Sequence, residues 1–359
     1  GACRSAGAPR LSALGFGIGL AEHGWVPDPI IRLIIRRMLR QRLSAIDAAR
    51  ADTGRDRRFA AEMAEAPIAR VPERANEQHY EVPAEFFAEV LGRYRKYSSC
   101  LYSETINTLD DAERAALAET AEHAALVDGQ DVLELGCGWG SLTLWIASHY
   151  PASRVTAVSN SASQREFIEK QARERGLSNL TMVTCDMNEF EPDESYDRIV
   201  SVEMFEHMSN WHELLRRVSG WLRDEGRLFI HIFNHRSTPY HFLEEGAGNW
   251  MGRHFFSGGI MPSRRLIECF GDLFGVVERW DWNGRHYART AEGWLRNLDC
   301  NKHAVMPVLR ETYGSVDAIV WFNRWRLFFL AVAELFAFNR GEEWGVSHYL
   351  LEKAGTTTR

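Results

Sequence analysis

Several features that define other classes of protein are missing from this sequence, and each absence excludes a class. The six cysteines among the 359 residues form no C-x-x-C pair and have no regular spacing. This pattern argues against a disulfide framework or a structural zinc site, so we expect a reducing, cytoplasmic environment and no bound metal. The formal net charge of −7 provides no overall basic field, and we expect no nucleic-acid partner. No signal-peptide pattern, internal repeat or low-complexity tract is visible.

Long uncharged apolar runs are missing as well. The most apolar late stretch, residues 318–338, contains Arg324, Arg326 and Glu334. Charges inside a span of this length disfavour a membrane crossing, so the stretch is predicted to be a buried helix. With 45% hydrophobic residues, the chain can still bury a large core as one large domain with additions.

The first 75 residues differ from the rest and are predicted to form a helical N-terminal extension. Residues 28–50 combine isoleucine, leucine and methionine with arginine in the pattern of a basic helix. One interpretation is docking on an anionic membrane surface, which would be a peripheral membrane contact. The other, which we favour, is a helix with solvated arginines, packed on the body of the protein or on the partner subunit of a homodimer. Residues 51–70 are expected to form a loose connector with weak helical character.

From residue 130 onward, strand-like and helix-like segments alternate along the chain. This order predicts an α/β fold with a doubly wound parallel sheet and helices on both faces. Ligands of such sheets bind beyond the carboxyl ends of the strands. Strands are predicted at 131–135, 155–158, 181–184, 198–202, 227–233, 276–280 and 346–351, and helices at 141–149, 163–175, 211–222 and 290–338.

The same pattern divides the chain beyond the N-terminal extension (1–75) into four parts. Residues 76–129 are expected to form a helical cap over the ligand, and residues 130–233 a Rossmann-like core. Residues 234–340, which begin with a stretch rich in glycine and aromatic residues, are predicted to be a substrate lid followed by a late strand and helices. Residues 341–359 complete the chain as a closing strand and tail.

The most informative motif runs from Val132 to Gly140, with the sequence V-L-E-L-G-C-G-W-G. It is typical of a buried strand, a tight glycine turn and the start of a helix, where the backbone approaches a ligand because glycine has no Cβ. The spacing differs from the dinucleotide fingerprint, and an acid at the strand end suits a ligand with an ammonium group. We therefore predict that Glu134, Gly136, Gly138 and Gly140 bind S-adenosylmethionine (SAM). A turn that serves packing alone is the alternative.

Polar residues also follow the next two predicted strands. Ser159, Asn160 and Gln164 stand where many nucleotide-binding folds place an acid that binds ribose hydroxyls. Asp186 could accept a hydrogen bond from an adenine amino group, while Met187 packs against the ring. The structural alternatives are a helix cap and an aspartate in a surface turn.

The fourth predicted strand ends in a cluster of ionisable residues, Glu203, Glu206 and His207. Burying such groups without partners costs several kcal/mol, and their mutual charge shifts pKa values toward neutrality. Glutamate and histidine are also suited to accept a proton near pH 7. Their place at the end of a strand favours a functional site over an exposed helix start whose acids complement the helix dipole.

Together these motifs resemble the cyclopropane-fatty-acid synthase family of SAM-dependent methyltransferases, and within it the coclaurine-type N-methyltransferases. The resemblance implies a class I SAM-methyltransferase fold over about residues 76 to 352, with SAM as the cofactor. It also implies that Tyr97, Ser98 and Ser99 contact the cofactor. The further segments that carry it are residues 79–80, 97–102, 283–290 and 341–344.

The resemblance leaves two chemistries open. In the coclaurine-like enzymes the E-x-x-E-H residues orient and deprotonate an amine, which implies this role for Glu203, Glu206 and His207. The synthases methylate an unsaturated lipid acyl chain and hold a bicarbonate ion as the base. That base would lie here among Cys100, Glu206, His231 and Tyr287.

Two positions depart from the synthase pattern. Phe233 replaces the usual isoleucine, and Glu203 replaces the usual glycine. An ionised Glu203 would be costly beside an apolar acyl chain but could pair with an ammonium group. We therefore favour N-methylation of a small amine, with methyl or methylene transfer to a lipid acyl chain as the alternative.

Overall fold

A computed structural model gives the fold and describes residues 13–48, 52, 54–70, 82–243, 246 and 249–355. Residues 79–80, which contribute to the family resemblance, lie outside this part of the chain. The centre of the molecule is a sheet of seven strands in the order β3-β2-β1-β4-β5-β9-β8. Its strands are β1 (Asp131–Leu135), β2 (Arg154–Ser159), β3 (Leu180–Thr184), β4 (Tyr196–Val202), β5 (Leu222–His235), β8 (Phe274–Trp282) and β9 (Trp344–Lys353).

The prediction of an all-parallel sheet was wrong at one strand. Strands β1 to β5 pair in parallel, but β9 lies antiparallel between β5 and β8. The apolar pattern of a strand indicates that it is buried and leaves its direction open. The connection that precedes a strand decides its direction. Here the chain enters β9 from the edge of the sheet at which β5 ends.

Both faces of the sheet are covered, as predicted. In β1, Val132 packs with α6 (Leu109–His123) and α7 (Ser141–His149), whereas Leu133 and Leu135 pack on the opposite face with α9 (Trp211–Trp221). This alternation follows from the two-residue period of a strand. Helix α8 (Ala162–Glu174) packs beside β2 and β3.

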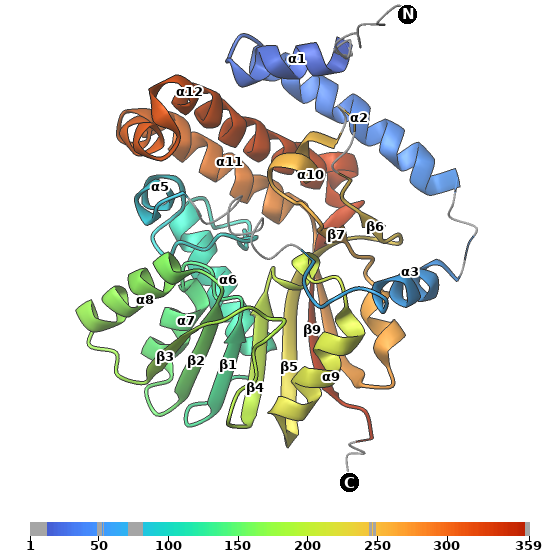
Figure 1. The fold of residues 1–359 in the computed structure, drawn as a ribbon, viewed down its shortest axis with the longest axis vertical. Helices are drawn as coiled ribbons and strands as arrows, with labels where there is room; N and C mark the ends of the chain where they lie inside the picture. Colours follow the sequence, from blue (N-terminus) through green and yellow to red (C-terminus); the bar gives the residue numbers. More distant parts are fainter. Residues whose placement is uncertain are drawn as a thin grey trace, which may run out of the picture.

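Two long helices cover the carboxyl edge of the sheet (Figure 1). They are α11 (Arg285–Cys300) and α12 (Lys302–Ala337), joined to α5 (Ala84–Val90) by a cluster of buried aromatic side chains. The sequence predicted one helical segment over 290–338. The structure instead has two helices, and Gly314 interrupts the second with a φ of 83°.

The apolar stretch near the end of α12 is buried, as predicted, and its charges are paired. Arg324 Nε lies 3.1 Å from Glu22, and Arg326 Nη2 lies 2.9 Å from Asp28. No helix in the described part of the chain meets the length and apolarity that a membrane crossing needs.

The N-terminal helices α1 (Ala13–Glu22) and α2 (Asp28–Ala48) lie across α12 (Figure 1). Arg32 and Arg36 of α2 both reach Glu334 of α12, at 3.0 and 2.5 Å. The interpretation of a helix packed on the body therefore holds, but these two arginines are paired rather than solvated. Residues 51–70 were expected to have only weak helical character. The structure instead has a regular helix there, α3 (Arg55–Met63).

The described residues between β5 and β8 form short elements. These are β6 (Tyr240–His241), α10 (Trp250–His254), β7 (Ile260–Met261) and the 3₁₀-helix η3 (Leu266–Phe270). The buried side chains of Trp250, Phe255 and Met261 join the same apolar cluster as α11 and α12.

Candidate active site

The glycine turn after β1 separates two hollows in the protein. Gly136 and Gly138 line both of them, so the two spaces meet at this turn. Gly136, Gly138 and Gly140 all adopt the left-handed conformation, with φ of 74°, 52° and 76°. A Cβ on Gly138 would meet no atom within 4 Å, whereas one on Gly140 would lie 2.6 Å from Ile168. Gly138 therefore serves the open space, and Gly140 serves the packing of α7 on α8.

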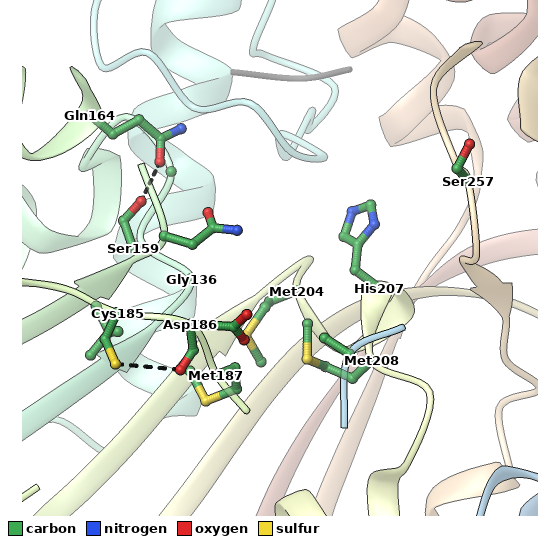
Figure 2. A pocket seen from close by; sticks show the side chains of 14 residues that line it. Gly136, Ser159, Gln164, Cys185, Asp186, Met187, Met204, His207, Met208 and Ser257 are labelled. Carbon is green, nitrogen blue, oxygen red and sulfur yellow. Dashed lines mark hydrogen bonds between the residues drawn. The ribbon is translucent and has the colours of Figure 1, made fainter. Parts of the chain in front are cut away.

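The first hollow lies over the ends of β2 and β3 (Figure 2). The Ser159 hydroxyl donates to Gln164 Oε1 at 2.6 Å. Gln164 Nε2 is buried and has no partner among the described residues, so it is available to a ligand oxygen. Asp186 and Met187 lie across the same space, as expected for an adenosine site. The predicted site residues Gly136, Gly138, Asn160 and His207 line it as well. The sequence analysis missed the remaining lining residues, which are Ala69, Val158, Cys185, Met204, Met208 and Ser257.

The second hollow lies under the segment that contains Lys96, Tyr97 and Ser98. Glu134 lines it and accepts a hydrogen bond from the Thr143 hydroxyl at 2.5 Å. Burial raises the pKa of Glu134 to about 8, and a nearby ammonium group would restore its ionised form. The two connected hollows thus fit a ligand with a nucleoside at one end and an ammonium group at the other, which are the two ends of SAM.

Two residues predicted to touch the cofactor line neither hollow. Gly140 begins α7 and packs against Ile168. Ser99 is buried, and its backbone N–H donates to Glu203 Oε1 at 3.1 Å. Contact of these two residues with the cofactor stays a prediction.

Glu203, directly after β4, lies at the centre of a hydrogen-bonded group. Its Oε2 accepts from the Tyr287 hydroxyl at 2.6 Å, and its Oε1 lies 3.2 Å from His231 Nε2. Its φ of 47° is in the left-handed region that favours glycine.

The residues proposed to hold bicarbonate surround the Glu203 carboxylate instead. Tyr287 and His231 both contact it, and the buried Cys100 lies in the same neighbourhood. A bicarbonate ion at these partners would bring a second negative charge against the Glu203 carboxylate. The set therefore does not fit bicarbonate, and a side-chain carboxylate fills the position. Burial raises the pKa of the Cys100 thiol, so the sulfur stays protonated.

Glu206 and His207 belong to the 3₁₀-helix η1 (Phe205–His207) and face different surroundings. Glu206 is buried, lines neither hollow, and its Oε2 has no partner among the described residues. Burial, followed by the charge of Glu203, raises its pKa well above the usual range. His207 projects from η1 into the first hollow, where its ring stacks on Phe256 with 5.6 Å between centroids (Figure 2).

Lys96 is a charged residue of the site that the sequence analysis missed. It is buried, and its Nζ donates to Ser98 Oγ at 2.5 Å and to the Ser99 carbonyl at 2.6 Å. Burial raises the pKa of Glu203, and the positive charge of Lys96 opposes part of that rise. The only signal in the sequence was its position next to the Tyr97-Ser98-Ser99 motif.

Comparison with known proteins identifies the relatives of this chain. The profile of the mycolic acid cyclopropane synthetase family matches residues 69–341. The (S)-coclaurine N-methyltransferase of Thalictrum flavum subsp. glaucum is 38% identical over 92% of this chain and 94% of its own length. The (S)-coclaurine N-methyltransferase of Papaver somniferum is 34% identical over 92% of this chain and 96% of its own length.

Structural similarity points to the same relatives. A crystal structure of coclaurine N-methyltransferase with N-methylheliamine and SAH matches with a TM-score of 0.90 at 37% identity, over 95% of this chain and 100% of that chain. The bound SAH, which is SAM without its methyl group, agrees with the SAM site predicted at the glycine turn. SAM is therefore the cofactor.

Proposed function

The chain belongs to the mycolic acid cyclopropane synthetase family, and we propose that this SAM-dependent N-methyltransferase acts on a small amine of the coclaurine type. The observation that carries the proposal is the Glu203 carboxylate, held by Ser99, Tyr287 and His231 at the end of β4. It lines the hollow that the glycine turn shares. A carboxylate in this place is suited to pair with the N–H of an amine or ammonium group.

The reaction requires a neutral amine whose lone pair faces the methyl group. SAM supplies that methyl group as an electrophile. In our proposal Glu203 binds and orients the amine nitrogen and accepts its proton, and His207, at the neighbouring hollow, helps to orient the amine. Burial and the charge of Glu203 raise the pKa of Glu206, which favours a neutral carboxylic acid beside Glu203.

The alternative, transfer to a lipid acyl chain, needs residues that hold a bicarbonate base, and these residues bind Glu203 instead. His231 and Tyr287, two of the four residues proposed to hold bicarbonate, contact Glu203. The buried carboxylate would also face an apolar chain without a compensating charge, which is unfavourable.

A product screen tests the proposal. The purified protein is incubated with methyl-labelled SAM, and coclaurine or heliamine competes with vesicles of unsaturated phospholipid while products are identified by mass. We expect label in the amine, and Glu203→Gln should lower its turnover by about 100-fold, within the range for loss of a group that assists proton transfer. The exposed Glu189 gives a control, because Glu189→Gln should leave turnover unchanged. Label found only in the lipid would overturn the proposal.

A further inference from the structure

Three histidines form a continuous row between Glu203 and the surface of the protein. His231 Nδ1 lies 2.8 Å from His348 Nε2, and His348 Nδ1 lies 2.8 Å from His123 Nδ1. At the inner end, His231 Nε2 lies 3.2 Å from Glu203 Oε1. At the outer end, His123 Nε2 lies 3.8 Å from Glu119 Oε1. Every ring nitrogen of the row thus faces another titratable group.

The sheet itself builds this row. His231 on β5 and His348 on β9 are direct cross-strand partners, and Trp280 on β8 is the next partner in register. Directly opposed residues project from the same face of a sheet, so the two imidazoles meet. His123, the last residue of α6, stacks on Trp280 with 3.9 Å between ring centroids. This stack fixes the third ring against the end of the row.

Burial keeps the three rings uncharged, so each ring can both donate and accept a hydrogen bond. His231 and His348 are fully buried, whereas the His123 side chain is 11% exposed and that of Glu119 is 34% exposed. Lys96 faces the two inner rings, and Glu122 faces His123. Burial lowers the pKa of all three histidines, so each neutral ring carries one proton and can donate at one nitrogen while it accepts at the other.

We propose that His231, His348 and His123 conduct protons between Glu203 and solvent, as an exit route for the proton that amine methylation releases. The proposal rests on the proposed function, because an amine that arrives as an ammonium ion must lose one proton before its nitrogen can accept the methyl group, so each turnover releases one proton. Once the substrate covers Glu203, a buried carboxyl has no direct path to water. The row provides that path through His231 and His348 to the partly exposed His123.

The transfer balances as four shifts of a proton between neighbouring atoms. Protonated Glu203 gives its proton to His231 Nε2, and His231 gives its Nδ1 proton to His348 Nε2. His348 then gives its Nδ1 proton to His123 Nδ1, and His123 releases its Nε2 proton to Glu119 or water. Glu203 is left ionised, each ring remains neutral in its other tautomer, and one proton has left the site. The rings return to their first tautomers by reorienting between turnovers.

The test follows proton release and methyl transfer in the same reaction. Enzyme, SAM and amine are mixed in weak buffer with a pH indicator, and N-methylated product is quantified by mass. We expect His348→Gln and His123→Ala to lower kcat by about 10-fold, with the KM for the amine unchanged and with delayed release of the proton. Imidazole in solution should restore His123→Ala, whose vacated position is near the surface, but leave the buried His348→Gln unchanged.

His149 provides a matched control. It ends α7 as His123 ends α6, and it stacks on Trp145 with 3.8 Å between ring centroids, but it contacts none of the three rings. His149→Ala should leave kcat and proton release unchanged. Wild-type proton release in His123→Ala would overturn the proposal, even if His348→Gln failed to fold. Absence of methylated amine from the wild-type reaction would instead refute the proposed function.

Discussion

Gly138 and Gly140 share a left-handed backbone but are glycine for different reasons. At Gly138 a Cβ would enter the open space between the two hollows, whereas at Gly140 it would collide with Ile168 at 2.6 Å. We expect Gly138→Ala to weaken SAM binding by at least 10-fold with a modest loss of stability of about 1 kcal/mol. Gly140→Ala should lower the free energy of unfolding by more than that, because strain and overpacking add. Titration calorimetry and chemical denaturation would separate the two effects, and equal losses of stability would contradict this assignment.

The φ of 47° at Glu203 allows its charge and its backbone to be tested separately. Glu203→Gly and Glu203→Ala both remove the carboxylate, so each should lose amine methylation by about 100-fold. The glycine variant should be more stable than the alanine variant by about 1 kcal/mol, because only alanine retains the left-handed strain.

The same pair of variants offers a chemical rescue. Formate should restore part of the activity of Glu203→Gly, since Tyr287 and Ser99 would then be free to bind a small carboxylate. Wild-type enzyme with formate is the control and should be unaffected. If saturating formate restored no activity, the reaction would need a carboxylate that is attached to the chain at residue 203, and a free carboxylate would not suffice.

At this scale the residue types of the site were predictable and several of their contacts were not. The motif after β4 indicated Glu203, Glu206 and His207, because three ionisable groups at the end of a buried strand are costly unless they have a function. Lys96 and His348 carried no such signal. Their significance depends on contacts with residues far away in the sequence, such as His348 with His231.

Helix α2 is held on α12 by an ion-pair cluster around Glu334. Its carboxylate is only 5% exposed and accepts from both Arg32 and Arg36. We expect Arg32→Ala to destabilise the protein by about 1 to 2 kcal/mol, because it leaves a mostly buried carboxylate with a weaker set of partners. Hydrogen exchange over residues 28–48 should rise with it. Arg37→Ala, on the exposed side of the same helix, is the control and should change neither measurement.

The limits of most central elements were predictable, but their directions and junctions were not. The helix 141–149 has the predicted bounds, because Gly140 caps its start and apolar residues follow along the helix. The antiparallel course of β9 and the division between α11 and α12 were not predictable. Both depend on packing at the carboxyl edge of the sheet rather than on the local pattern of residues.

The whole molecule should become less stable as the pH rises from 6.5 to 8 through two buried carboxyls. Burial raises the pKa of Glu113 to about 7 and that of Glu134 to about 8, above the values in the unfolded chain. Each carboxyl favours the folded state at low pH, and that advantage is lost as the pH rises through its folded pKa. The slope reaches about 1.4 kcal/mol per pH unit for each group.

Comparison of variants isolates the contribution of one carboxyl from all other titrating groups. Without SAM, the Tm of Glu134→Gln should fall less than that of the wild type between pH 6.5 and 8, because glutamine does not titrate. Glu311→Gln, at an exposed position on α12, should retain the wild-type slope. An unchanged slope in Glu134→Gln would mean that the Glu134 carboxyl is not protonated in the folded protein.

The sequence by itself determined the alternation of strands and helices, the glycine turn and the acids at the end of β4, because these depend on residues close together in the chain. The tertiary structure alone decided which of these residues face the hollows. It also placed His231 and Tyr287 against the Glu203 carboxylate, although the sequence left open that they hold a bicarbonate base. It also built the row of histidines from β5, β9 and α6. Such contacts depend on strand register and on the packing of helices across the sheet, and neither is encoded in the spacing of neighbouring residues.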